Sequence, residues 1–160
     1  MKSGVLVRVD RGIYLKQDCW EDEFLLLQIK YPTGIFSYET ALYLHGLTDR
    51  TPAKLTMTFT QGYNPPSLKN ENVIAKRVVP ENYGFGITNG TSPAGNDIQL
   101  YDIERTLCDI VRGSGADIQI VNAAMKRYAA APGKDIHKLM QYAEKLRVKK
   151  KILRYMEVLL

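Results

Sequence analysis

Several chemical features are scarce in this chain of 160 residues, and each scarcity argues against a class of protein. Its two cysteines, Cys19 and Cys108, are far apart and have no histidine at ligand spacing, so neither a disulfide scaffold nor a metal site is expected. No apolar run approaches the roughly 20 residues that a membrane span needs, and the first residues lack a signal-peptide pattern. We therefore expect a cytoplasmic protein without a membrane partner, a metal or a cofactor.

Recognisable catalytic motifs are equally scarce. The chain contains no phosphate-binding loop of the form G-x-x-x-x-G-K-[ST], and His137 has no partner nearby in sequence. His45 is close enough to Asp49 for a general base to be considered. Residues 48–52 are better explained as a turn in which Asp and Thr side chains cap backbone groups. We predict no catalytic residues.

The net charge of +5 is concentrated in the C-terminal part of the chain. Residues 1–133 contain 14 basic and 14 acidic side chains, whereas residues 134–160 contain 8 basic and 3 acidic ones. Six of the ten residues from Lys145 to Arg154 are basic, and on a helix Arg147, Lys151 and Arg154 would form one stripe. A solvated helix face explains this run as well as contact with DNA phosphates or an acidic partner does.

The order of predicted elements indicates an α+β fold. Residues 4–15 favour a β-hairpin with its turn at Gly12, and Ser37 is placed to cap a helix. Helices are expected at 21–31 and 38–45, and strands at 54–60, 73–79, 84–88 and 97–101, with a turn at 89–90. Asp102 is a predicted helix cap, and from this residue onward the apolar residues recur at the spacing of a helix. We expect a small mixed or antiparallel sheet, the N-terminal hairpin, and a C-terminal cluster of about four helices.

Three carboxylates, Asp102, Glu104 and Asp109, lie close together at the start of this helical part. Arg105 precedes Asp109 by four positions, which favours a surface ion pair worth only about 0.3–0.5 kcal/mol. Helix capping together with buried ion pairs is the leading interpretation of the segment, and recognition of a partner is the second. An enzyme acting on nucleotide or phosphoryl groups is a third class, because paired carboxylates can hold Mg²⁺.

Four segments, in this order, resemble the AbiEi family of antitoxin-repressors from bacterial type IV toxin–antitoxin systems. They are the wing-like residues 6–14, residues 35–48, residues 101–109 and the helical tail from 127 to 160. The resemblance implies a non-enzymatic antitoxin domain over residues 17–160. Residues 1–16 would form a hairpin similar to the wing of a winged helix whose recognition helix is not in this chain. The implied partner is a toxin with a nucleotidyltransferase fold, and full-length family members also repress their own operon by binding operator DNA.

The candidate sites follow from these patterns and from the resemblance. The candidates for contact with DNA are Arg8, Arg11, Arg147, Lys149, Lys150, Lys151 and Arg154. The candidates for partner recognition are Glu39, His45, Asp49, Arg50, Asp102, Glu104, Arg105 and Asp109. Binding to operator DNA is expected to be weakened, because major-groove readout needs an inserted helix or β-ribbon. The alternative function is a DNA-binding transcriptional regulator, without an antitoxin role, in which the hairpin and the tail form one composite basic surface.

Overall fold

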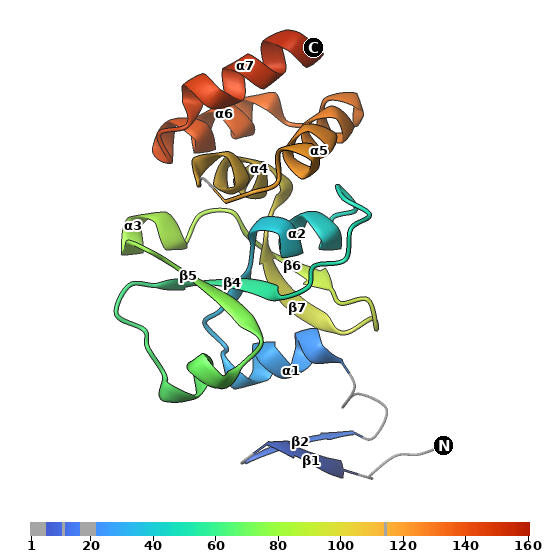
Figure 1. Cartoon of the computed structure of the whole chain (residues 1–160), viewed down its shortest axis with the longest axis vertical. Helices are drawn as coiled ribbons and strands as arrows, with labels where there is room; N and C mark the ends of the chain where they lie inside the picture. The colour runs from blue at the N-terminus through green and yellow to red at the C-terminus, as the bar shows by residue number, and fades with distance from the viewer. Residues whose placement is uncertain (1–5, 11, 17–21, 114) are drawn as a thin grey trace.

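The computed structural model describes residues 6–10, 12–16, 22–113 and 115–160, so Arg11 and Cys19 lie outside the described residues. A short antiparallel hairpin, formed by β1 (Leu6–Asp10) and β2 (Ile13–Lys16), lies at one end of the molecule (Figure 1). Gly12 adopts a φ of 72°, the left-handed conformation that a tight turn takes from glycine. The hairpin predicted for this part of the chain is therefore present.

A five-stranded mixed sheet occupies the middle of the molecule, with the strand order β5-β4-β3-β7-β6. Its strands are β3 (Ile35–Phe36), β4 (Leu55–Thr60), β5 (Val73–Val78), β6 (Ile87–Thr91) and β7 (Asp97–Tyr101). β4 pairs in parallel with β5, and β6 pairs antiparallel with β7. The short β3 joins these two halves, because Phe36 pairs with Met57 on one side and with Leu100 on the other.

Helices cover both sides of this sheet. α1 (Glu23–Lys30) lies on one side, and α2 (Tyr38–Leu44) lies on the other (Figure 1). Beyond α2 stand the four C-terminal helices, α4 (Ile103–Arg112), α5 (Ile118–Ala130), α6 (Ile136–Lys145) and α7 (Lys149–Leu159). Asp102 caps α4 as predicted, since its Oδ1 accepts the backbone N–H of Arg105 at 2.8 Å. The α+β class, the hairpin and the helical cluster agree with the sequence prediction.

Two separate apolar cores hold these layers together. The first lies between α1 and the sheet and consists of Leu27, Tyr31, Phe36, Leu55, Met57, Phe59, Leu68, Ile98 and Leu100. The second lies among α2 and the C-terminal helices, and its fully buried members include Leu42, Leu107, Ala124, Met125, Leu139 and Ile152. The described helices are all too short or too polar to cross a membrane. The buried charged residues of α4, Glu104, Arg105 and Asp109, lie on a helix whose apolar residues belong to the second core.

The sequence prediction was wrong at residues 84–90, where a strand at 84–88 and a turn at 89–90 were expected. Residues 80–83 form a short helix, α3 (Pro80–Tyr83), with proline in its first turn, and the strand begins only at Ile87. Asn89 and Gly90 belong to that strand instead of a turn. A Cβ at position 90 would lie 2.7 Å from a methyl carbon of Leu100, so the glycine accommodates a neighbour in the next strand. The segment between β4 and β5 contains a 3₁₀ turn, Pro66–Asn70.

Candidate functional site at the junction of α2 and α4

The two segments with the most distinctive charged residues meet in the fold. α2 packs against α4, and the Nε2 atom of His45 donates to the backbone carbonyl of Tyr101 at 2.8 Å. Tyr101 ends β7, and α4 begins two residues later. The carbonyl of Tyr101 also accepts the hydroxyl of Thr106 at 3.3 Å. Segments about sixty residues apart in sequence therefore form one packed unit between the sheet and the helical cluster.

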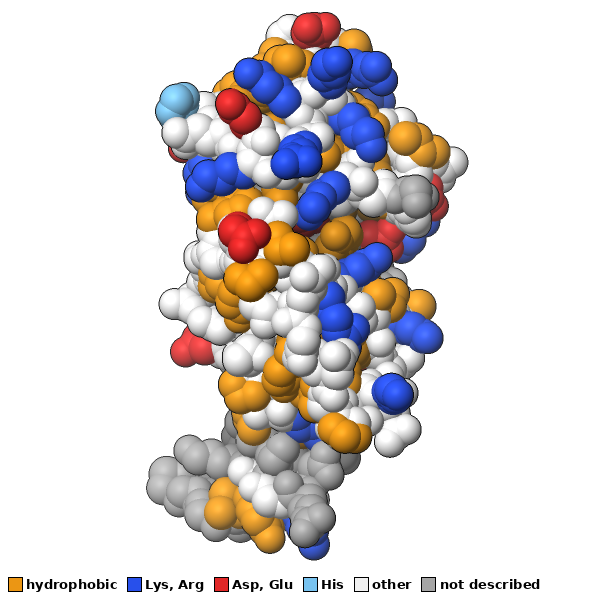
Figure 2. Space-filling view, turned by 90° about the vertical axis from the view of Figure 1, so that its left-hand side faces the viewer, with side chains coloured by type: hydrophobic (Ala, Val, Ile, Leu, Met, Phe, Trp, Pro, Cys, Tyr) orange, Lys and Arg blue, Asp and Glu red, His pale blue; other side chains and the backbone are white. Residues whose placement is uncertain are grey.

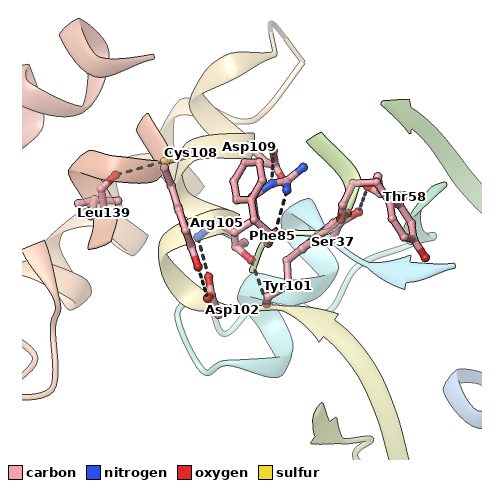
Figure 3. Close-up of polar contacts among 12 residues, drawn as sticks. Ser37, Thr58, Phe85, Tyr101, Asp102, Arg105, Cys108, Asp109 and Leu139 are labelled. Atoms are coloured by element: carbon pink, nitrogen blue, oxygen red, sulfur yellow. Dashed lines mark hydrogen bonds and ion pairs between the residues drawn. The ribbon is translucent and has the colours of Figure 1, made fainter. Parts of the chain in front are cut away.

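Arg105 is the centre of this unit and has no exposed side-chain surface. Its Nε donates to both carboxylate oxygens of Asp109, at 3.1 and 3.2 Å, and its Nη1 donates to the carbonyl of Phe85 at 3.0 Å (Figure 3). The guanidinium carbon lies 4.4 Å from the ring centre of Phe85 and 4.1 Å from that of Tyr101. Aromatic faces attract a cation most strongly where water is excluded, so these rings replace part of its lost hydration.

The pair between Arg105 and Asp109 is buried, with 0% and 1% of the two side chains exposed. The sequence offered two expectations for this segment: a surface pair from the four-residue spacing and buried ion pairs along the helix. The second is confirmed and the first is wrong. Burial raises the pKa of Asp109 to about 6, although the charge and hydrogen bonds of Arg105 act to lower it. Arg105 therefore favours the charged form of this carboxyl group, whereas burial opposes it.

A glycine allows the chain to approach this arginine. Gly86 has a φ of 85°, and a Cβ at that position would lie 2.8 Å from the Cβ of Arg105. Its carbonyl accepts the backbone N–H of Asp102 at 2.7 Å, which joins the turn before β6 to the start of α4. Glycine adopts this positive φ readily and has no Cβ that would collide with Arg105. The Nη2 atom of Arg105 is buried and has no hydrogen-bond partner among the described residues.

The other two carboxylates of α4 have partners from α5 and α6. Asp102 accepts the hydroxyl of Tyr142 at 3.2 Å and pairs with Lys138 at 3.0 Å. Glu104 accepts the hydroxyl of Tyr128 at 3.0 Å, and the same lysine lies 3.4 Å from it. The acidic cluster therefore joins α4 to the neighbouring helices. Within the described part of the chain, no group of three or more acidic, His or Cys side chains is arranged to hold a metal ion.

The loop after α2 is joined to α5 by two exposed ion pairs. Asp49 pairs with Arg127 at 2.7 Å, and Arg50 pairs with Asp117 at 2.8 Å. Thr48 caps this turn, because its hydroxyl accepts the backbone N–H of Arg50 at 3.2 Å. The considered dyad of His45 and Asp49 does not form, since each side chain contacts a different partner. The capping predicted for residues 48–52 is confirmed for Thr48 only, since the carboxylate of Asp49 contacts Arg127 and not the backbone.

Glu39 and its neighbours lie at the other end of α2. Glu39 is partly exposed, whereas Ser37 is buried and its Oγ accepts the hydroxyl of Thr58 at 2.7 Å. Ser37 stands at the N-cap position of α2 as predicted, but its side chain makes no capping hydrogen bond. Tyr38 has a φ of 55°, which is rare for an aromatic residue. The sequence alone does not reveal this strained position, which lies within the family-like segment 35–48.

The basic residues of the tail are brought together, although not as the predicted helical stripe. α6 ends at Lys145, and Arg147 adopts a φ of 61° in the turn before α7, so it does not share a helix with Lys151 and Arg154. Lysines and arginines nevertheless gather at the helical end of the face in Figure 2. A hollow of about 470 Å³ is lined by Glu144, Arg147, Val148, Lys149, Lys150, Lys151 and Arg154.

The hairpin lies far from this basic surface. Arg8 is exposed on β1, at the end of the molecule opposite α7 (Figure 1). The hairpin and the tail therefore do not form the continuous basic surface that the alternative function assumed. Lys151 also has a structural contact, because its Nζ donates to the carbonyl of Val111 at 3.0 Å.

In comparisons with known proteins, no protein-family model matches this chain, and no curated protein matches it.

Proposed function

We propose that this chain is the antitoxin domain of an AbiEi-like protein and acts as a non-enzymatic suppressor of a nucleotidyltransferase-like toxin. The observation that carries the proposal is the ordered series of family-like segments at 6–14, 35–48, 101–109 and 127–160. The packing of α2 on α4 is compatible with it, because two of these segments form a single unit. The charged residues of that unit contribute more to packing within the fold than to an exposed surface.

Within this proposal, different residues have different roles. Arg105, Asp109 and Glu104 are buried and position α4, so they act on a partner only through the fold. Asp49 and Arg50 are exposed beside α5 and are the better candidates for direct contact. Charge reversal at the two exposed residues should affect toxin suppression without unfolding the chain. Their present ion pairs are solvent-exposed and contribute little to stability.

Growth rescue tests the proposal. A nucleotidyltransferase-like toxin encoded beside this gene is induced with and without the 160-residue chain. Rescue of growth is the expected result, and it should persist in a variant with Arg8 changed to Ala, since Arg8 lies at the far end from the helical cluster. Failure of rescue, with both proteins folded and expressed, would reject the antitoxin proposal for this chain.

A second candidate function, binding of DNA, is favoured by one observation. Several basic side chains surround the hollow beside the turn from α6 to α7, and Glu144 is the one acidic side chain among its lining residues. Phosphate contacts through such a surface would not read sequence. If three or four lysines and arginines each neutralise a phosphate, the logarithm of the affinity for duplex DNA should fall with the logarithm of salt at a slope of about −2.7 to −3.6.

The matched variants for this second function are chosen from the contacts. A triple change of Arg147, Lys149 and Lys150 to Glu should abolish retention on duplex DNA at low salt. Lys151 is left unchanged because it binds the end of α4. A triple variant with Lys54, Lys69 and Lys76 changed to Glu alters the net charge equally, at exposed positions outside the helical cluster. If both variants lose DNA equally, the effect reflects net charge and not a site.

A further inference from the structure

A second groove on the helical cluster shares only Lys151 and Arg154 with the basic hollow described above. It has a volume of about 610 Å³ and lies between α5 and α7, above the end of α4. Its apolar lining residues are Ile110, Val111, Ala116, Ile118, Val121, Tyr155, Val158 and Leu159. Ile118 and Val158 are 61% and 83% exposed. Ile118 continues the apolar period of α5 with Val121, Met125 and Tyr128, which are buried, so its exposure is unexpected for the isolated chain.

The two walls of the groove have the spacing of helix-packing surfaces. α7 contributes residues 151, 154, 155, 158 and 159, which follow the i, i+3, i+4, i+7, i+8 pattern of one helix face. α5 contributes residues 118, 121, 122 and 126 with the same spacing. Two neighbouring helices that present such faces to one groove can accommodate the ridge of a third helix. The stripe on α7 extends over about 12 Å, or about two helical turns.

The charges around the groove all have one sign. Lys126, Lys151 and Arg154 are among its lining residues, and no Asp or Glu is. Within the described residues, neither Lys126 nor Arg154 forms a salt bridge. An occupant with acidic side chains beside an apolar stripe would therefore match both the groove and its rim.

We propose that the groove between α5 and α7 binds an acidic amphipathic helix of a partner protein. A second copy of this chain is a poorer occupant. Its exposed helix α7 has four basic residues and one acidic residue, and would bring like charges against the cationic rim. The proposal does not depend on the antitoxin function, because it rests on the shape and charge of the groove alone.

Peptide binding to the intact chain tests the proposal. The probe is a fluorescein-labelled helical peptide of about 14 residues, four turns, with leucines on one face and glutamates beside them. Its control is the same peptide with lysine in place of glutamate. Fluorescence anisotropy should show binding of the acidic peptide with a Kd of about 10 μM, and at least about tenfold weaker binding of the basic one.

Variants of the chain locate the binding. Arg154→Glu and Val158→Asp should each weaken binding about tenfold, since both residues line the groove and are exposed. Lys149→Glu changes the same charge on α7 outside the groove and should leave the Kd within about twofold. Circular dichroism confirms that each variant folds. Equal binding of the two peptides, absence of binding, or insensitivity to Arg154→Glu would overturn the proposal. Dimerisation of the chain that Val158→Asp abolishes would overturn it in favour of a second copy.

Discussion

Replacement of Arg105 by methionine is the perturbation that tests the account of the α2–α4 junction most directly. Methionine retains an unbranched apolar stem but removes the charge, three hydrogen bonds to Asp109 and Phe85, and the contacts with two aromatic rings. Removal of one partner from a buried ion pair costs about 3–5 kcal/mol of unfolding free energy, because the other charge is left in an apolar surrounding. A surface pair would cost at most about 1 kcal/mol.

The pH dependence of this variant gives a second, independent signature. Burial raises the pKa of Asp109 to about 6, whereas carboxyls of aspartate have a usual value of 3.8. In the wild type, the stability contribution of Asp109 is therefore present below pH 3.8 and is lost as the pH rises towards about 6. Without Arg105 the pKa rises further, so the native state holds its proton at higher pH. The destabilisation by Arg105→Met should then increase as the pH rises above about 6, with a limiting slope of about 1.4 kcal/mol per pH unit.

Guanidinium unfolding followed by circular dichroism at several pH values measures both effects. The double variant Arg105→Met with Asp109→Leu should be more stable than the single variant at pH 8, because it has no buried carboxyl group that must either take up a proton or remain as an unpaired charge. Arg50→Met, which removes an arginine from an exposed pair with Asp117, is the control and should change the midpoint little. A cost below about 1 kcal/mol for Arg105→Met, independent of pH, would refute the assignment of a buried structural pair.

Three further predictions concern the same region. Gly86→Ala should destabilise the chain by about 2 kcal/mol more than Gly95→Ala, since both glycines have positive φ but only at position 86 would a Cβ clash with the buried arginine; thermal unfolding compares them. In a Cys19→Ser background, the thiol of Cys108 should react with a thiol reagent at pH 8 only after unfolding, because burial raises its pKa to about 12; rapid reaction of the native protein would contradict this. Tyr128→Phe should cost about 1–2 kcal/mol in urea unfolding, because its hydroxyl links the acidic cluster to the start of α6; an unchanged midpoint would show that water replaces these contacts.

Local patterns predicted many elements of this fold correctly. The period-two run at 54–60 became β4, and the change to a helical period after Asp102 marked the start of the helical cluster. The cap at Asp102 was predicted because a carboxylate at that position satisfies a free N–H group of the first helical turn. These interactions involve residues close in sequence, so the sequence pattern is sufficient to find them. The mixed pairing of the sheet is not local, and the two-residue strand β3 was missed.

The charged segments show the limit of such patterns. The spacing of Arg105 and Asp109 predicts that they meet, but not whether water surrounds them. Tertiary structure decided this, because Phe85 and Tyr101 come from other elements and cover the guanidinium. Similarly, Ile118 follows the apolar periodicity of a core residue and is nevertheless exposed, because α5 and α7 separate there into a groove. The sequence by itself determined which residues face together along one helix. Only the packing of distant segments decided which of those faces are buried, since burial depends on what the rest of the chain places against them.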